Sequence, residues 1–194
     1  IDLSTSLAAS SFAEDTATGT TIVTASAIHS EGDAITFSLS GTGSEKFSVS
    51  SDGTVTLSSA LDYESTTSYN LTLTASDGSN TATNNLVFSV SNINEAATLS
   101  TSVASSSFAE NISTGTTIAT ASATDPENAT ISYSLSGTGS DKFSVSSNGT
   151  VTLSSGLDYE STTSYSLTLT ASDGTYSATS SISFSVTDIS ELAF

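Results

Sequence analysis

The carboxylates of this chain are concentrated in short motifs, and one stretch that carries three of them occurs twice. Residues 61–78 read LDYESTTSYNLTLTASDG, and residues 157–174 read LDYESTTSYSLTLTASDG. Closely spaced carboxylates such as Asp62 and Glu64 suit two chemistries. They can form the acid and base couple of a glycosidase, or they can supply oxygen ligands to a hard cation such as calcium.

The overall charge narrows the classes of partner. The chain has 20 acidic residues against two lysines, Lys46 and Lys142, and a formal net charge of −18. Phosphate recognition requires clustered Lys and Arg, so nucleic acid is excluded as a partner. Cysteine is absent, which excludes disulfides, a thiolate nucleophile and a zinc–thiolate site. No apolar run approaches 18 residues, so we expect no direct membrane insertion.

The chain consists of two copies of one sequence. Residues 1–98 overlay residues 97–194 without a gap, with identity at about two thirds of the positions. A repeat of this length predicts two whole domains rather than the turns of a solenoid. The boundary falls in the segment NINEAA, residues 92–97, and the predicted domains are residues 1–95 and 96–194.

The elements that must position the acids are predicted to be strands. Apolar residues alternate with Ser, Thr or Asn at a period of two, which is typical of half-buried strands. Two rows are expected to face inward, namely Tyr69, Leu71, Leu73 and Ala75, and Leu86, Phe88 and Val90. Further strands are expected near residues 7–12 and at 20–27, 34–40, 46–50 and 54–58. About seven strands per copy predict an all-β fold, two tandem seven-stranded Greek-key, immunoglobulin-like β-sandwiches.

The order of the acids resembles that of the cadherin repeat. The motifs that carry the resemblance are FAE at 12–14 and 108–110, LDYE at 61–64 and 157–160, ASDG at 75–78 and 171–174, DPE at 125–127, and the linker NINEAA. Cadherins carry D-x-N-D-N-x-P at that linker, whereas this chain has Ala97 in place of the usual proline. The linker resembles more closely that of bacterial cadherin-like modules.

The resemblance implies that Ca²⁺ is held between consecutive modules. The first module and the linker would contribute Glu14, Asp62, Glu64, Asn92, Asn94 and Glu95, and the second module would contribute Asp125, Glu127 and Asp173. Seven of these nine residues are carboxylates, which would repel one another strongly unless cations neutralised them. Calcium accepts roughly six to eight oxygens at about 2.3–2.6 Å in irregular geometry, which suits ligands drawn from loops.

The two modules differ where a second acidic cluster is expected. The second module reads DPENA at 125–129, whereas the first reads HSEGD at 29–33 and lacks the leading aspartate. We therefore expect calcium to bind weakly or not at all at this end of the first module. His29 is expected to be a solvent-exposed loop histidine. Further acids are assigned to the two outer ends, namely Glu31, Asp33, Asp77, Glu110, Asp158, Glu160, Asp188 and Glu191.

These features favour a structural function. We expect a calcium-dependent extender or adhesion stalk, a piece of a larger secreted or cell-surface bacterial protein. Its expected partners are neighbouring repeats, and a homotypic or surface-glycan partner is a further candidate. The runner-up is a carbohydrate-binding module, for which Tyr63, Tyr159 and Tyr176 would be candidate stacking residues. An enzyme is not expected, because both copies hold the paired carboxylates in one motif and neither has a cleft-forming insertion.

Overall fold

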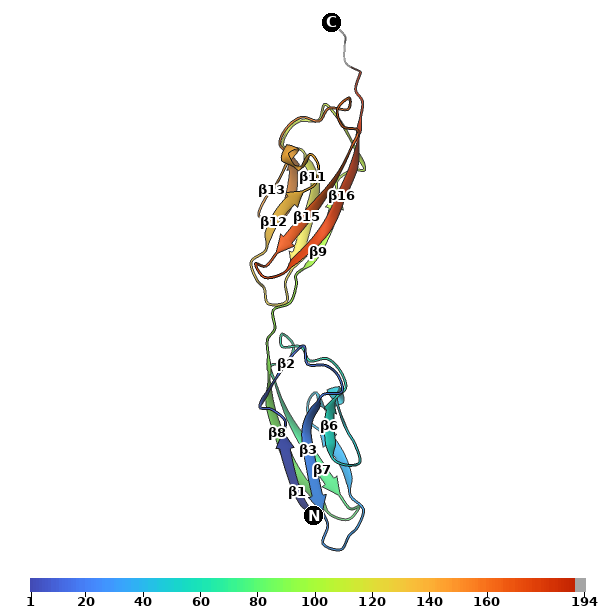
Figure 1. Cartoon of the computed structure of the whole chain (residues 1–194), viewed down its shortest axis with the longest axis vertical. Coiled ribbons are helices and arrows are strands. Elements are labelled where there is room, and N and C mark those ends of the chain that lie inside the picture. Colours follow the sequence, from blue (N-terminus) through green and yellow to red (C-terminus); the bar gives the residue numbers. More distant parts are fainter. Residues whose placement is uncertain (191–194) are drawn as a thin grey trace. The chain divides into compact units, whose positions relative to one another are not determined.

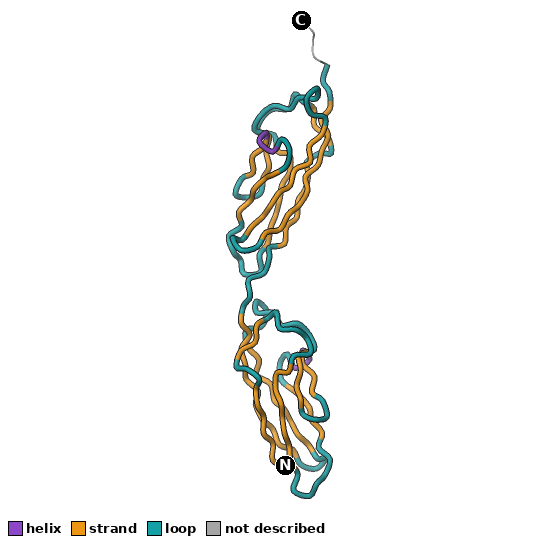
Figure 2. The backbone as a smooth tube through the Cα atoms, viewed as in Figure 1, coloured by secondary structure: helices purple, strands orange, loops and turns teal. Residues whose placement is uncertain are grey.

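The computed structural model describes residues 1–190, and the chain divides into two compact units between Ile93 and Asn94. Unit 1 comprises residues 1–93, and unit 2 begins at Asn94. Each unit consists of strands that run between two ends where the loops gather, as Figure 2 shows. Loops at two ends of a rigid sandwich are the positions at which ligand-binding side chains are most readily placed.

Unit 1 is a sandwich of two four-stranded sheets (Figure 1). One sheet has the order β1-β3-β6-β5 and the other the order β2-β8-β7-β4. The strands are β1 (Asp2–Leu7), β2 (Ser11–Ala13), β3 (Thr21–Ile28), β4 (Thr36–Ser40), β5 (Phe47–Val49), β6 (Thr54–Leu57), β7 (Ser68–Ser76) and β8 (Thr81–Ser91), with the short 3-10 helix η1 (Ser44–Lys46) before β5.

Unit 2 repeats this arrangement. Its sheets have the orders β9-β11-β14-β13 and β10-β16-β15-β12. The strands are β9 (Thr98–Val103), β10 (Ser107–Ala109), β11 (Thr117–Thr124), β12 (Ser132–Ser136), β13 (Phe143–Val145), β14 (Thr150–Leu153), β15 (Ser164–Ser172) and β16 (Ser177–Thr187), with η2 (Ser140–Lys142) before β13. The prediction of two tandem all-β sandwiches is confirmed.

The first part of each unit differs from the prediction of a single strand near residues 7–12. The chain instead forms two strands that belong to different sheets, which gives eight strands in unit 1 rather than seven. β1 pairs antiparallel with β3, whereas β2 pairs parallel with β8, with Phe12 opposite Val90. The switch between sheets lets β1 extend one sheet while Phe12 is buried against the other.

The core of unit 1 confirms both predicted inward rows. Tyr69, Leu71 and Leu73 on β7 are at most 2% exposed, and the row on β8 is also buried. The ring of Tyr69 lies edge-on to Phe47 and stacked on Phe88, with centroids 5.1 and 5.5 Å apart. Gly43 lies over the same ring at a φ of 82°, and a Cβ there would approach it to 2.5 Å, so the turn before η1 requires glycine.

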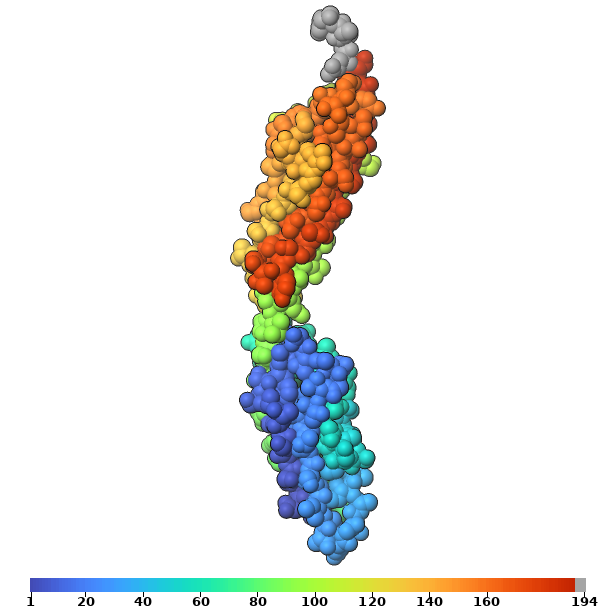
Figure 3. All heavy atoms as spheres, in the orientation of Figure 1, coloured from blue at the N-terminus to red at the C-terminus, as the bar shows by residue number. Residues whose placement is uncertain are grey.

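The sheets leave little of the core open to solvent. In the space-filling view of Figure 3, the visible face of each unit is covered by packed side chains. The outward rows of the strands are mostly Ser and Thr, as on β7, where the exposed and buried positions alternate. The acids of the FAE, LDYE and ASDG motifs lie outside the strands, in the loops at the ends of the sandwiches.

Candidate metal centre

The C-terminal pole of unit 1, formed by Glu14, the loop 61–64 and residues 92–93, is organised around one buried glutamate. Because β2 runs parallel to β8, Glu14 follows β2 beside the chain that leaves β8, and its N–H donates to the Ser91 carbonyl at 3.1 Å. Glu14 Oε2 accepts the Tyr63 N–H at 2.7 Å, and Oε1 accepts the Ile93 N–H at 2.6 Å. A single carboxylate thus ties three segments together.

Two further acids of this pole lie beside Glu14. Glu14, Asp62 and Glu64 each place a carboxylate oxygen within 4.8 Å of the others. Asp62 Oδ1 accepts the Ser65 N–H at 2.8 Å, which fixes the loop, and Asn92 Nδ2 donates to Glu64 Oε1 at 3.2 Å. Four of the predicted ligands are therefore brought together within unit 1, with three carboxylates spaced closely enough to share a divalent cation.

The C-terminal pole of unit 2, formed by Glu110, the loop 157–160 and residues 188–189, has the same construction. Glu110 Oε2 accepts the Tyr159 N–H at 2.8 Å and Oε1 accepts the Ile189 N–H at 2.7 Å. These two backbone donors lower the pKa of Glu110. Glu110, Glu160 and Asp188 lie within 4.8 Å of one another. Glu191, which was also assigned to this end, lies outside the described residues.

The N-terminal pole of unit 2 comprises residues 94–95, 125–129 and 173–176. Asn94 Nδ2 donates to Asp173 Oδ2 at 2.8 Å, and Asp173 Oδ1 accepts the N–H groups of Thr175 and Tyr176 at 2.6 Å each. The Asn94 amide, followed by these two N–H groups, lowers the pKa of Asp173. The Glu95 N–H lies 3.4 Å from Glu127 Oε2. The linker residues are thereby attached to this pole.

Two carboxylate oxygens at this pole are buried without a hydrogen-bond partner. They are Asp125 Oδ2 and Glu127 Oε1, whereas Asp125 Oδ1 accepts the Ala129 N–H at 2.9 Å. A buried anionic oxygen that has lost water and gained no donor carries a free-energy penalty of roughly 1–3 kcal/mol or more. A cation would remove that penalty, and the all-oxygen donor set fits calcium.

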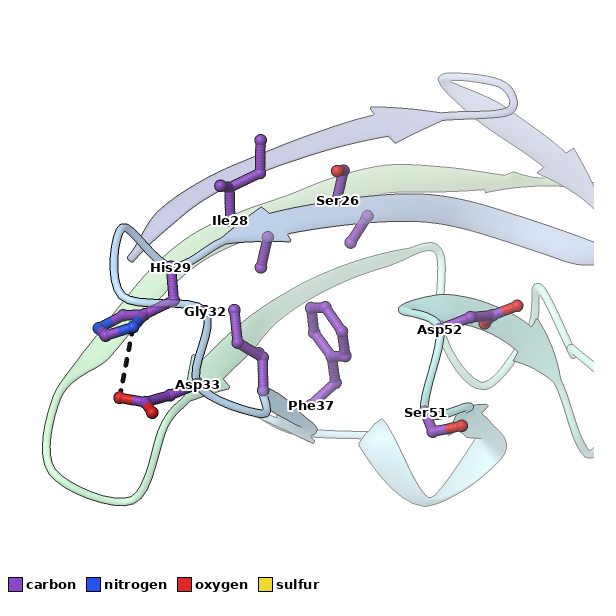
Figure 4. Close-up of a pocket in the computed structure, with 11 residues that line it drawn as sticks. Ser26, Ile28, His29, Gly32, Asp33, Phe37, Ser51 and Asp52 are labelled. Carbon is purple, nitrogen blue, oxygen red and sulfur yellow. Dashed lines mark ion pairs between the residues drawn. The ribbon is translucent and has the colours of Figure 1, made fainter.

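The N-terminal pole of unit 1, formed by residues 29–33 and 77–80, contradicts the expectation for His29. The His29 side chain is only 9% exposed rather than open to solvent. Its Nε2 lies 3.1 Å from Asp77 Oδ2. On the other side of the ring, Nδ1 lies 3.5 Å from Asp33 Oδ2, the pair that Figure 4 marks with a dashed line. The backbone N–H groups of Asn80 and Ser79, with the Asn80 amide, lower the pKa of Asp77 to about 2.

The two sandwiches correspond to matches with one family model. The cadherin domain model matches residues 9–91 and again residues 104–187, which together make up most of the chain. The chain belongs to the cadherin domain family. Cadherin domains are adhesion-type extracellular modules that depend on calcium, and they are typically not enzymes. No curated protein matches the chain in a sequence search.

Solved cadherin structures share the fold. Human protocadherin-24 EC1-2 (form II) is 24% identical, with a TM-score of 0.61 over 92% of this chain and 94% of that one. PcdhgB3 EC1-4 is 22% identical, with a TM-score of 0.67 over 97% of this chain and 50% of that one. Drosophila N-cadherin EC1-4 is 22% identical, with a TM-score of 0.59 over 92% of this chain and 47% of that one. The chain thus spans about half of the two longer proteins.

Two further observations concern the cadherin chain as a whole. Among residues 1–190, no helix has the length and apolar character required to cross a membrane.

The sequence motifs located the acids but not the backbone donors that hold them, which are the N–H groups of Tyr63 and Ile93 in unit 1. The repeated FAE and LDYE motifs carry no signal for those contacts, because any residue except proline supplies a backbone N–H.

Proposed function

We propose that this cadherin chain is a calcium-dependent extender or adhesion module, in which Ca²⁺ at the link between the two units restrains their relative motion. In this proposal unit 1 contributes Glu14, Asp62, Glu64 and Asn92, and unit 2 contributes Asn94, Glu95, Asp125, Glu127 and Asp173. The chain would act mechanically, within a larger secreted or cell-surface protein whose neighbouring repeats are its first partners.

The observation that carries the proposal is the pair of buried carboxylate oxygens without partners, Asp125 Oδ2 and Glu127 Oε1. In each of the two C-terminal poles, the central glutamate accepts two backbone N–H groups. Unsatisfied acidic oxygens are therefore not a general property of the acidic poles of this fold. Divalent calcium would satisfy both oxygens at once, and it accepts further oxygens from loops at the same time.

The anchoring of the linker supports the same conclusion. Ile93 is bound to unit 1 through Glu14, while Asn94 is bound to unit 2 through Asp173. These two residues are joined by a single peptide bond, so hardly any chain lies between the last anchor of one acidic group and the first anchor of the next. We infer that both groups serve one set of ions.

Charge gives the proposed link its dependence on calcium. Seven carboxylates belong to the two acidic groups, and unit charges about 4 Å apart repel by about 4 kcal/mol at a surface dielectric near 20. Two or three divalent ions would convert this repulsion into attraction. Without them, the repulsion would favour conformations in which the acidic groups separate, and the linker would bend more freely.

The alternative, a carbohydrate-binding module, has less support. Polysaccharide recognition by stacking needs a row of exposed aromatic side chains. Among residues 1–190, Tyr176 is the only aromatic residue among the strongly exposed large apolar side chains, at 47% exposed. A glycan array would detect such binding, and aggregation of protein-coated beads with calcium or with EDTA would detect homotypic adhesion.

Small-angle X-ray scattering tests the mechanical proposal. In calcium, we expect scattering from a narrow set of conformations, and in EDTA a changed radius of gyration with a broader distribution of distances. Asp125→Ala combined with Glu127→Ala should give the EDTA-type profile even in calcium. His29→Ala, at the position in unit 1 that corresponds to Asp125, is the matched control and should behave as the unmodified protein. Superimposable profiles of the unmodified protein in calcium and EDTA would contradict the proposal.

A further inference from the structure

The N-terminal pole of unit 1 contains a histidine whose two ring nitrogens have different surroundings. Nε2 lies at hydrogen-bonding distance from Asp77 Oδ2, 3.1 Å away. Nδ1 is buried and has no hydrogen-bond partner, and the side chain as a whole is more than nine-tenths buried. A buried polar atom without a partner costs free energy, so this nitrogen requires an explanation.

Asp77 determines which ring nitrogen carries the proton. Its side chain is 3% exposed, and its Oδ1 accepts the N–H groups of Ser79 and Asn80 at 2.8 and 2.6 Å. Its Oδ2 accepts the Asn80 amide at 3.2 Å and faces His29 Nε2. A carboxylate held in this way acts as an acceptor, so a neutral His29 carries its proton on Nε2. The lone pair of Nδ1 is then left available for a ligand.

The carboxylate of Asp33 lies on the side to which this lone pair points. His29, Glu31 and Asp33 each place a ligand atom within 4.8 Å of the others, and Nδ1 is 3.5 Å from Asp33 Oδ2. Atoms bound to one tetrahedral zinc ion at about 2.0–2.2 Å lie about 3.3–3.6 Å apart. The nitrogen and the oxygen are therefore already spaced as two zinc ligands would be. Figure 4 shows the ring and Asp33 facing each other beside the hollow.

We propose that His29 Nδ1, Asp33 and Glu31 bind a zinc ion and that Asp77 orients the imidazole from behind. A ligating histidine usually donates its second ring N–H to a carboxylate, and the contact with Asp77 provides this arrangement. Imidazole nitrogen suits zinc, whereas calcium takes oxygen ligands. The site differs in metal and in place from the proposed calcium link, and it does not depend on that link.

The surroundings leave room for the remaining ligand. A hollow of about 430 Å³ is lined by His29, Asp33, Phe37 and Asp52 among others. A water molecule entering from the hollow would complete a tetrahedral set of one nitrogen and two carboxylate oxygens. The bound ion would hold the loop 29–33 against the turn 77–80, which His29 already contacts from the other side of its ring.

The most specific test uses the fact that His29 is the only histidine of the chain. Its imidazole nitrogens give the only side-chain histidine signals in a long-range ¹H–¹⁵N NMR spectrum. At neutral pH in saturating calcium, we expect the protonated nitrogen to be Nε2. Added Zn²⁺ should move the Nδ1 resonance far more than the Nε2 resonance. Two protonated nitrogens that do not respond to zinc would identify a plain ion pair with Asp77 and Asp33 and would overturn the proposal.

Calorimetric titration with Zn²⁺ in saturating calcium provides an independent readout. The unmodified protein should bind one equivalent that His29→Gln and His29→Asp lose, and Asp77→Asn should weaken binding by about 10–100-fold. Asp52→Asn is the matched control, because Asp52 lines the same hollow but already accepts the Thr54 N–H at 3.0 Å. Zinc binding of equal affinity in His29→Gln and the unmodified protein would overturn the proposal, whatever the outcome of the calcium experiments.

Discussion

Asp77 in unit 1 and Asp173 in unit 2 occupy the same turn of the same sandwich, and each accepts two backbone N–H groups from the residues that follow it. Their remaining partners differ. Asp77 faces the imidazole of His29, whereas Asp173 accepts the amide of the linker residue Asn94. The framework of the two poles is therefore shared, while the group presented to a ligand is not.

The neighbouring loops show the same contrast. In unit 2 the loop presents two carboxylate oxygens without partners, from Asp125 and Glu127. In unit 1 the corresponding loop presents one imidazole nitrogen without a hydrogen-bond partner, from His29. Under the two proposals, the differences between HSEGD at 29–33 and DPENA at 125–129 change the preferred cation from one that takes oxygen to one that also takes nitrogen.

The largest expected effect tests what the units have in common. In Glu14→Gln, the side-chain amide can accept only one of the two backbone N–H groups that Glu14 binds, and its NH2 group faces the other. One unsatisfied N–H and the lost charge together should lower the free energy of unfolding by about 2–4 kcal/mol. We expect urea unfolding, followed by circular dichroism in EDTA, to show this loss. Glu110→Gln should also destabilise the protein in EDTA, because Glu110 makes the corresponding bonds.

The response to calcium should differ between Glu14→Gln and Glu110→Gln. Glu14→Gln should lose part of the stabilisation that calcium gives the link, whereas Glu110→Gln should leave calcium binding at the link unchanged. An equal response of the two variants to calcium would show that Glu14 has only the structural role of Glu110.

The next effect tests where the units differ. Asp125→Ala removes one of the two unsatisfied oxygens, so we expect calcium to bind at least about tenfold more weakly, or about 1.4 kcal/mol. The rise in melting temperature on adding calcium should shrink in parallel, because a ligand stabilises the state it binds. Titration calorimetry measures the calcium affinity of Asp125→Ala and of the control variant His29→Ala. The control should bind calcium as the unmodified protein does. Identical calcium titrations for Asp125→Ala and the unmodified protein would remove Asp125 from the site.

The smallest effect concerns acid. The pKa of Asp77 is lowered to about 2, and that of Asp173 is also lowered, from ordinary values near 4 in an unfolded chain. A lowered folded-state pKa stabilises the fold above the unfolded value, and this stability is lost as the pH falls through the folded value. The melting temperature in EDTA should therefore fall between about pH 4 and pH 2. Asp77→Asn should flatten this fall, and an unchanged pH profile would count against the assigned contacts.

Most of the fold could be predicted from the sequence, because alternation at a period of two directly encodes which side of a strand is buried. The rows around Leu71 on β7 and Phe88 on β8 were found in this way, and both are buried. The division of the first strand into β1 and β2 was not found. Short segments rich in Ser and Ala give no periodic signal that would reveal a change of sheet.

The candidate sites were less predictable. Motif order located the acids, since the repeat marks Glu14 and Asp62 twice in the chain. The environment of His29 could not be inferred, because its contact residue Asp77 is distant in sequence and lies in the turn between β7 and β8. A single polar residue in a loop carries no pattern from which burial can be calculated.

The central claim, that calcium restrains the two cadherin units through the acidic groups beside Ile93 and Asn94, is tested most directly by a distance distribution. The chain has no cysteine, so Ser59→Cys and Ser155→Cys give one exposed spin label on each unit. Double electron–electron resonance should show a narrow distribution in calcium and a broad one in EDTA, and Asp125→Ala should broaden the distribution in calcium. A distribution of the same width in calcium and in EDTA would contradict the account.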